Sequence, residues 1–395
     1  MPHLWRVPLT TLARIDRCAA SRPPKHITLN DLEALMSRKS RKARPSAFIK
    51  EAQWLQEELP LRLAVLMRHF HRLPFIAMRC EPLAQVYDIY LEDFENMSAI
   101  PKVASGEDVL SWTEYLKQSQ SKRADVVALT RQAVGELQRF PDVKESLETF
   151  LDKVFITRIG RSLVEDHFIV FVDHSTTKRA TDPSCWPSSD GLVTEVMLAP
   201  LLRKVAETVQ QLSQQIYGQR TEVIIAEDER EMKTVHSIPR YLYFVFQEVL
   251  KNAIKATQEK HPINSPPVQI TIVTGTYDVQ VKISDRGGGM PRNVLKNIWQ
   301  YGYSGFQESH PERMDGGGLM GDLSLDPQRE LSGFGVGLPL SRLYIRYLGG
   351  DLQVSQVFGH GTEVSIVLSL HGQHEDPTVA DVDSLQGGAS SISMA

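Results

Sequence analysis

Three short segments decide the fold of this chain: Glu248-Val249-Leu250-Lys251-Asn252-Ala253, Asp285-Arg286-Gly287-Gly288-Gly289-Met290 and Gly333-Phe334-Gly335-Val336-Gly337-Leu338. The first lies in a run whose apolar residues recur at helical spacing from Leu242 to Ala256, and Pro239 suits the first turn of such a helix. The second follows a predicted strand, and the third opens a predicted helix. Because each segment stands at or beside a different element, we expect the three to meet in one site.

Two polar residues of the first segment share one face of the predicted helix. Glu248 and Asn252 are four residues apart, so their side chains project from one row of the helix toward the same space. Carboxylate and amide oxygens suit Mg²⁺, which keeps several waters and takes few protein ligands beside nucleotide phosphates. Taken alone, the two residues are equally compatible with a solvated polar face.

The second segment follows a predicted hairpin. Apolar and polar residues alternate over 268–273 and 279–284, with Gly275-Thr276-Tyr277-Asp278 between them. Asp285 ends the second strand, and the glycines after it permit a sharp turn that lets a planar ring approach the backbone. A carboxylate held at that turn can accept the amino hydrogen of adenine, although the same residues alone also fit an ordinary loop.

The third segment precedes an apolar-periodic run from Leu338 to Leu348. Glycines that open a helix let backbone N–H groups contact phosphate oxygens, and the helix dipole favours negative charge there. Lys and Ser/Thr do not follow the glycines, so this is not a Walker loop, and residues 326–332 before it are not a strand, which excludes a dinucleotide-binding fingerprint. The three segments in this order predict an ATP site.

The segments resemble the asparagine box and the two glycine boxes of the GHKL ATPase superfamily, which includes gyrase, heat-shock chaperone, histidine kinase and MutL branches. Longer strings are similar to the mitochondrial pyruvate dehydrogenase kinase and branched-chain ketoacid dehydrogenase kinase family: they are Gln56-Glu57-Glu58-Leu59-Pro60-Leu61-Arg62-Leu63-Ala64, Lys251-Asn252-Ala253, Ser284 to Gly289, and Gly333 to Arg342. The resemblance covers about 29–370. It implies an α+β protein in which an N-terminal helical bundle precedes a GHKL-type α/β sandwich ATPase domain.

The resemblance also implies roles for individual residues. Glu248 would accept the proton of the substrate hydroxyl, Asn252 would bind Mg²⁺ and Asp285 would bind adenine. The nucleotide-binding residues that it places in this chain are Asn252, Lys255, Asp285, Gly287, Gly289, Met290, Tyr303, Ser304, Gly333, Phe334, Gly335, Val336, Gly337, Leu338 and Thr362. The aperiodic, glycine-containing stretch 307–330 corresponds to the ATP lid of the family, and a plain insert is the alternative.

The implied activity is ATP-dependent phosphorylation of a serine on the E1α subunit of a 2-oxoacid dehydrogenase complex, which inactivates that complex. The implied partners are E1α, the lipoyl domain of E2, which would dock on the helical bundle, and a second copy of the chain. We expect the pyruvate complex as the target and keep the branched-chain complex as the alternative. An alternative from another class is a lipoyl-domain scaffold that binds ATP with little turnover.

The chain departs from the family pattern at two places. Many members carry a histidine four residues before the asparagine-box glutamate, where it can polarise that base, and this chain has Phe244. No Trp follows Trp299, so the Asp-Trp tail motif of animal pyruvate dehydrogenase kinases is missing, as it is from branched-chain kinases. A two-component histidine kinase is the main rival, but its best acceptor, His167, is followed by Phe168-Ile169-Val170 and is expected to be structural.

Composition agrees with a protein of two or more domains. A chain of 395 residues exceeds the usual size of one core, and its net charge of -4 gives no sign of nucleic-acid binding. No apolar run approaches the length that spans a bilayer. Three scattered cysteines, Cys18, Cys80 and Cys185, predict neither a disulfide framework nor a zinc site and favour a reducing compartment.

The chain is predicted to have four parts. Residues 1–24 carry four arginines against one acid, which is typical of a mitochondrial presequence and predicts a matrix protein. Residues 25–180 are predicted to form the helical bundle, with apolar periodicity over 55–70, 83–94, 126–140 and 146–170. A Pro/Ser-rich linker, 181–191, leads to the ATP-binding domain, 190–370, with a helix over 193–217 and further strands over 222–226, 352–357 and 363–368. The tail, 371–395, is predicted to be disordered.

Overall fold

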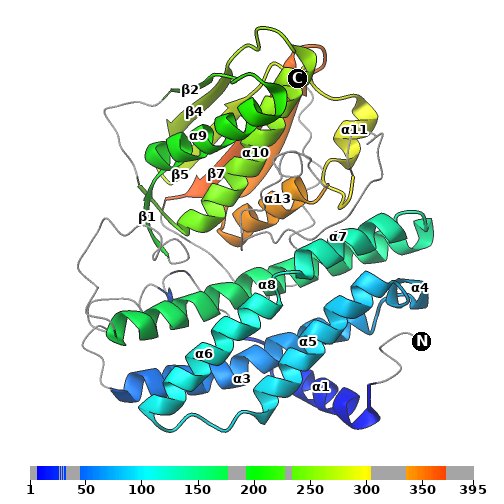
Figure 1. Cartoon of the computed structure of the whole chain (residues 1–395), viewed down its shortest axis with the longest axis vertical. Helices are drawn as coiled ribbons and strands as arrows, with labels where there is room; N and C mark the ends of the chain where they lie inside the picture. Colours follow the sequence, from blue (N-terminus) through cyan, green and yellow to red (C-terminus); the bar gives the residue numbers. More distant parts are fainter. Residues whose placement is uncertain are drawn as a thin grey trace. The chain divides into compact units, whose positions relative to one another are not determined.

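The computed structural model describes residues 7–25, 27, 29, 31–32, 45–176, 193–226, 234–303 and 335–370. The chain divides into two compact units, a helical one before the linker and a layered one of strands and helices after it (Figure 1). The predicted lid, linker and tail lie outside the described residues, as do Ser304, Gly333 and Phe334. The expected α+β class, with helices first and an α/β sandwich second, is confirmed.

Long helices make up the described part of the first unit. They are α1 (Leu9–Ser21), α3 (Pro45–Phe70), α4 (Phe75–Met78), α5 (Glu81–Ala99), α6 (Gly106–Lys122), α7 (Val126–Leu137) and α8 (Pro141–Thr176). The four predicted periodic stretches fall in α3, α5, α7 and α8. The core between them is aromatic as well as aliphatic: Phe70 packs edge-on against Tyr87 and Phe150, with ring centroids 5.4 and 4.6 Å apart.

The sequence analysis does not predict α6. The helix begins at a capping box, in which Ser105 accepts from the backbone of Asp108 and Asp108 accepts from the backbone of Ser105. Its buried face mixes Val109, Trp112 and Leu116 with hydroxyl residues, so its apolar periodicity is weak. Burial against α3 and α8 rather than sequence pattern defines this element.

A buried ion network lies among α5, α6 and α8. Arg161 contacts Asp93 at 2.6 Å and Glu165 at 2.7 Å, and Arg123, at the end of α6, contacts Glu165 at 2.6 Å. Burial opposes ionisation of Asp93, yet the two guanidinium groups hold its pKa at about 2. Two carboxylates and two guanidinium groups therefore neutralise each other, so each of these buried charges has a partner of opposite sign.

The string from Gln56 to Ala64 forms the middle of α3. Glu58 is fully buried and accepts from Arg62, one turn on, at 3.0 Å. Gln56 clamps the loop after α5, because its side chain donates to Pro101 O and accepts from Val103 N. Pro60 lies inside the helix and cannot donate to the carbonyl four residues earlier. This stretch of α3 therefore binds the loop after α5 and also carries a buried carboxylate, that of Glu58.

Helix α1 is built into this unit. Ile15 is fully buried, Thr11 bonds Glu95 of α5, and Arg22 just beyond the helix contacts the buried Glu58 at 2.8 Å. Residues 1–24 are predicted to be a presequence because of their arginines; in the structure Arg22, whose side chain is 41% exposed, pairs with the buried Glu58, and Arg14 lies over the ring of Phe94. These contacts make α1 part of the folded unit, and the presequence over residues 1–24 stays a prediction.

In its described residues, the second unit contains a five-stranded mixed sheet covered on one face by three helices, together with a small two-stranded sheet (Figure 1). Its elements are β1 (Thr194–Met197), α9 (Leu198–Tyr217), β2 (Val223–Ala226), β3 (Thr234–Ser237), α10 (Pro239–Lys260), β4 (Val268–Thr274), β5 (Asp278–Ser284), α11 (Arg292–Asn297), α13 (Gly337–Tyr347), β6 (Asp351–Val357) and β7 (Gly361–Ser369). The strand order is β2-β4-β5-β7-β6, and only β2 and β4 pair in parallel within this sheet.

One predicted element of this unit is corrected. The helix expected over 193–217 begins only at Leu198, because Thr194–Met197 form β1, which pairs antiparallel with β3. Val196 and Val235 are opposite each other and both are buried, so β1 gains from a partner about forty residues away. The other predicted strands match β2, β4, β5, β6 and β7 within a few residues.

The two faces of the sheet differ in polarity. Val279, Val281 and Ile283 of β5 are buried toward the helices. The opposite face carries polar pairs, such as Gln280 Nε2 to Ser365 Oγ at 2.5 Å and Ser284 Oγ to Glu363 at 3.0 Å. This alternation is why the period-two pattern could be read from the sequence. Among the described residues, no helix is long and apolar enough to cross a membrane.

We expect Ile15→Ala to lower the free energy of unfolding by roughly 2–5 kcal/mol, because it leaves a cavity in the core of the helical unit. Leu9→Ala, on the same helix at 83% exposure, is the matched control and should change it by less than about 0.5 kcal/mol. Urea unfolding of both variants measures the difference. Equal effects would mean that α1 is not part of the folded unit.

Candidate nucleotide site

Helix α10 carries the first site residues. Its apolar stripe, including Leu242, Val245 and Val249, is buried against the rest of the unit and fixes how the helix is rotated. Glu248 and Lys255 are half-buried and Asn252 is exposed, so the helix presents these polar residues at the edge of its packed face. Glu248 and Asn252 therefore offer two oxygen donors one turn apart, which fits a Mg²⁺ ion held together with phosphate oxygens.

The carboxylate of Glu248 has close neighbours. Its Oε1 lies 2.5 Å from Lys251 Nζ. Its Oε2 lies where a Cβ at Gly337 would be, so any side chain at residue 337 would overlap it. Because Gly337 is the first residue of α13, this contact brings the asparagine-box glutamate and the second glycine box together, as the sequence analysis expects of one site.

Asp285 lies where β5 ends. Its Oδ1 accepts from Gly287 N at 2.8 Å and Thr362 N at 3.1 Å, and its own N–H donates to Thr362 O at 2.9 Å. Burial raises the pKa of the Asp285 carboxyl, while the two backbone hydrogen bonds and Lys260 act in the opposite direction. Within the described residues no hydrogen bond reaches Oδ2. The carboxylate thus has one oxygen that accepts hydrogen bonds from the protein and a second oxygen that can accept a hydrogen bond from a ligand.

The glycine turn after Asp285 packs directly against its neighbours. A Cβ at Gly287 would overlap Ala256 of α10, so this turn approaches the helix as only glycine can. Gly288 and Gly289 have φ of +89° and +71°, a left-handed conformation that other residues rarely adopt. Gln356 of β6 clamps the end of the turn, because its side chain accepts from Met290 N and donates to Met290 O at 2.7 Å.

The described part of the second glycine box begins at Gly335. Gly302 N donates to Gly335 O at 2.8 Å, and a Cβ at Gly335 would overlap the backbone of Gly302 and Tyr303. Both glycines have φ near +70°. Val336 is buried ahead of α13, and Leu338 is half-buried in its first turn. This backbone contact between Gly302 and Gly335 therefore brings Tyr303 and the second glycine box together. The two are predicted as site residues from separate segments.

Sequence reasoning missed three residues that shape this site. Gln356 clamps Met290, Lys251 contacts Glu248, and Gly302 crosses Gly335. Gln356 and Gly302 belong to segments without a recognisable motif, so no sequence signal pointed to them. Lys251 stands inside the asparagine box, and its i, i+3 spacing to Glu248 was an available signal.

The arrangement can bind a nucleotide and pass a proton. Asp285 and the glycine turn offer an acceptor and an open backbone for a purine, and the start of α13 offers N–H groups for phosphates. The Glu248 carboxylate, a group that can take up a proton, lies beside that helix start, and Asn252 is one turn away. Phe244, one turn before Glu248, is buried with its ring centroid 5.2 Å from that of Tyr344, and it carries no proton donor.

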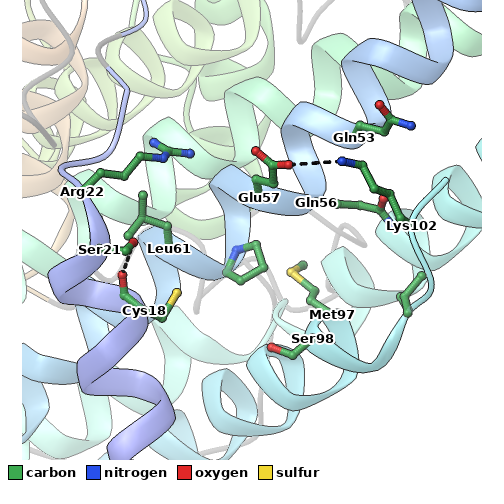
Figure 2. Close-up of a pocket in the computed structure, with 12 residues that line it drawn as sticks. Cys18, Ser21, Arg22, Gln53, Gln56, Glu57, Leu61, Met97, Ser98 and Lys102 are labelled. Carbon is green, nitrogen blue, oxygen red and sulfur yellow. Dashed lines mark hydrogen bonds and ion pairs between the residues drawn. The ribbon is translucent and has the colours of Figure 1, made fainter.

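A separate pocket of about 470 Å³ lies in the helical unit (Figure 2). Residues of α1, α3 and α5 and the loop after α5 line it, and Arg22, Glu57 and Lys102 are its charged side chains. Each is paired, Glu57 with Lys102 at 3.6 Å and Arg22 with Glu58 at 2.8 Å. The pocket's glutamines, Gln53 and Gln56, are hydrogen-bonded to the loop after α5. We assign no ligand to it, since its charged groups and glutamines are engaged within the unit.

The fold and the site together match a known class. Residues 237–372 match the family model of histidine kinase-, DNA gyrase B-, and HSP90-like ATPases, which is the GHKL class. Residues 27–191 match the model described as mitochondrial branched-chain alpha-ketoacid dehydrogenase kinase. The protein is thus a GHKL ATPase domain joined to the helical domain of the mitochondrial dehydrogenase kinases.

Individual proteins similar to this chain identify the family more closely. The chain is 30% identical to a mitochondrial pyruvate dehydrogenase (acetyl-transferring) kinase of Arabidopsis thaliana, over 82% of this chain and 86% of that protein. It is 30% identical to a probable kinase of the same name from Caenorhabditis elegans, over 80% and 77%, and 29% identical to isozyme 1 of Mus musculus, over 80% and 71%. The chain belongs to the mitochondrial pyruvate dehydrogenase kinase family. It is an ATP-dependent protein kinase, so the resemblance drawn from the sequence is confirmed.

We expect Asp285→Asn to weaken ATP binding by about 10- to 100-fold, since hydrogen bonds to charged groups contribute roughly 1.5–3 kcal/mol. The asparagine keeps one oxygen for Gly287 and Thr362, so the turn should stay folded. Calorimetric titration with ATP measures the change. Asp278→Asn, at the exposed hairpin of the same unit, is the control. Unchanged affinity in Asp285→Asn would remove Asp285 from the adenine site.

Proposed function

We propose that this kinase phosphorylates a serine of the E1α subunit of the pyruvate dehydrogenase complex in the mitochondrial matrix and so inactivates the complex. The observation that carries the proposal is the match to pyruvate dehydrogenase kinases over 80–82% of the chain, in both units. The site supports it, since Glu248, Gly337 and Asp285 occupy places that suit transfer of a phosphoryl group from ATP.

Nucleotide binding would use the described contacts. Asp285 Oδ2 accepts a hydrogen bond from the adenine amino group, and the turn of Gly287 and Gly289 admits the ring. Met290 and Thr362, which are held by Gln356 and Asp285, border the purine. The phosphates lie at the start of α13, near Gly335 to Leu338, with Lys255 and Tyr303 at the edge. Ser304, Gly333 and Phe334 complete this assignment by resemblance.

A magnesium ion, when bound, would supply positive charge that neutralises the charge developing on the phosphates. Asn252 is its proposed protein ligand, since its side chain is exposed one turn from Glu248. In the transfer step Glu248 takes the proton of the serine hydroxyl. The hydroxyl oxygen then bonds the γ-phosphorus while the bond from that phosphorus to ADP breaks. Because the transition state is loose, positioning and charge neutralisation contribute more than base strength.

The proposed partners are E1α as substrate, the lipoyl domain of E2 and a second copy of the chain. Docking of the lipoyl domain is assigned to the helical unit, because that unit carries none of the predicted nucleotide-binding residues and has a core of its own. The assignments of the lipoyl domain and of a second copy of the chain rest on the family resemblance.

Two alternatives remain part of the proposal. The match of residues 27–191 to a branched-chain alpha-ketoacid dehydrogenase kinase model favours the branched-chain complex as the second candidate target. A scaffold that binds ATP and a lipoyl domain with little turnover is the candidate from another class. The replacement of the family histidine by Phe244 is the feature that favours it.

The substrate is tested by incubating the full chain with radiolabelled ATP and purified E1 from each of the two complexes. We expect label on a serine of E1α from the pyruvate complex, with matching loss of its dehydrogenase activity. Faster labelling of the branched-chain E1 would make the branched-chain complex the preferred target and the pyruvate complex the alternative. ATP binding without label on either E1 would favour the scaffold.

Two variants of α10 separate the proton acceptor from the metal ligand. Glu248→Gln keeps the size of the side chain, so ATP affinity should hold while transfer to E1 falls by roughly 10²- to 10⁴-fold. Asn252→Ala should instead lose the Mg²⁺-dependent part of ATP binding. ATP titrations with and without Mg²⁺, alongside the transfer assay, measure both. Near-normal transfer by Glu248→Gln would refute its role as the base.

A further inference from the structure

The carboxylate of Glu248 is held by a lysine of its own helix. Lys251 lies one turn further along α10, and its Nζ is 2.5 Å from Glu248 Oε1. Only 12% of the lysine side chain and 13% of the glutamate side chain are exposed. An exposed pair of this spacing is screened by water and contributes little, whereas an enclosed pair interacts strongly and restricts both side chains to one geometry.

The second oxygen of Glu248 has a different environment. A Cβ at Gly337 would overlap Oε2, so this oxygen occupies space that only glycine leaves open. Gly337 opens α13, an eleven-residue helix that, among the described residues, has no side-chain cap. Its first N–H groups therefore carry unpaired positive partial charge beside Oε2. The two oxygens are thus unequal, since an ammonium binds Oε1 and the start of the phosphate-side helix borders Oε2.

Phe244 cannot orient this carboxylate. It stands where many family members have a histidine, and its ring packs against Tyr344 with a centroid distance of 5.2 Å. A phenyl ring has no N–H to donate to a carboxylate. The group that fixes Glu248 in this chain must therefore come from another position, and Lys251 is within hydrogen-bond distance.

We propose that Lys251 is a positioning residue for phosphoryl transfer, which binds Glu248 Oε1 and leaves Oε2 as the atom that accepts the serine proton. The inference rests on the proposed role of Glu248 as the base. It assigns to Lys251 the orienting function that Phe244 cannot supply. Lys251 itself takes no proton in the step and contacts no reacting atom.

The first test compares Lys251→Met and Lys251→Arg in the full chain with E1 as substrate. Lys251→Met should lower kcat by about 10- to 100-fold, the usual result of misplacing a catalytic group, with KM for ATP changed by less than about twofold. Lys251→Arg keeps the charge and should recover part of kcat. Lys282→Met is the matched control, since Lys282 is ion-paired with Glu363 on the outer face of the sheet and should leave kcat unchanged.

A double-mutant cycle with Glu248→Gln makes the test specific. If Lys251 acts through Glu248, the variant Glu248→Gln/Lys251→Met should be no slower than Glu248→Gln alone, because the two losses are not additive. If the kcat losses of the two single variants multiply in the double variant, the proposal is overturned. A large rise in KM for ATP at unchanged kcat would also overturn it, because it would make Lys251 a phosphate ligand. Thermal unfolding checks each variant, and the cycle is run with Lys251→Arg if the methionine variant does not fold.

Failure of the two proposals can be told apart in the same assay. Near-normal transfer by Glu248→Gln alone refutes the base itself, whatever Lys251 does. A slow Glu248→Gln beside a fully active Lys251→Met leaves the base in place and refutes only the positioning role.

Discussion

The hydrogen bonds around Asp285 are the constraint on which the proposed nucleotide site depends. One carboxylate oxygen accepts from Gly287 N and Thr362 N, so it ties the end of β5 to the start of β7 and to the turn between β5 and α11. Hydrogen bonds to an ionised acceptor are strong, and burial makes the loss of either one costly. Because the turn is anchored in this way, Gly287 can lie against Ala256, and the strand end stays open to a ligand.

The same unit uses glycine at the places where two segments must approach. Gly337 leaves room for the Glu248 carboxylate, and Gly335 crosses Gly302 backbone to backbone. A side chain at any of these positions would push apart two elements that together make the site. The glycines of the boxes therefore serve close packing between segments.

The helical unit depends on buried charge in a comparable way. Glu58 is enclosed by Arg62 and Arg22, and Asp93 and Glu165 by Arg123 and Arg161. Such groups are costly to bury unless they are paired, so the loss of one partner would leave an uncompensated charge inside the unit. The pairing of Arg22 with Glu58 also explains why α1 belongs to the unit, although its arginines are typical of a targeting segment.

The sequence by itself determined the elements whose signals are local. Two alternating strands before Asp285, the helix from Pro239 and the glycine boxes could be recognised because period, capping and turn chemistry are written in consecutive residues. Tertiary structure alone decided what depends on distant partners. Strand β1 exists because β3 pairs with it, α6 because α3 and α8 bury it, and α1 because Glu58 and α5 bind it. The hydrogen bonds between Gln356 and Met290 are likewise visible only in the tertiary structure. So are the different neighbours of the two Glu248 oxygens. The physical reason is that burial and ion pairing join residues far apart in the chain. Local propensity depends on neighbouring residues and therefore does not specify the distant partner of a residue.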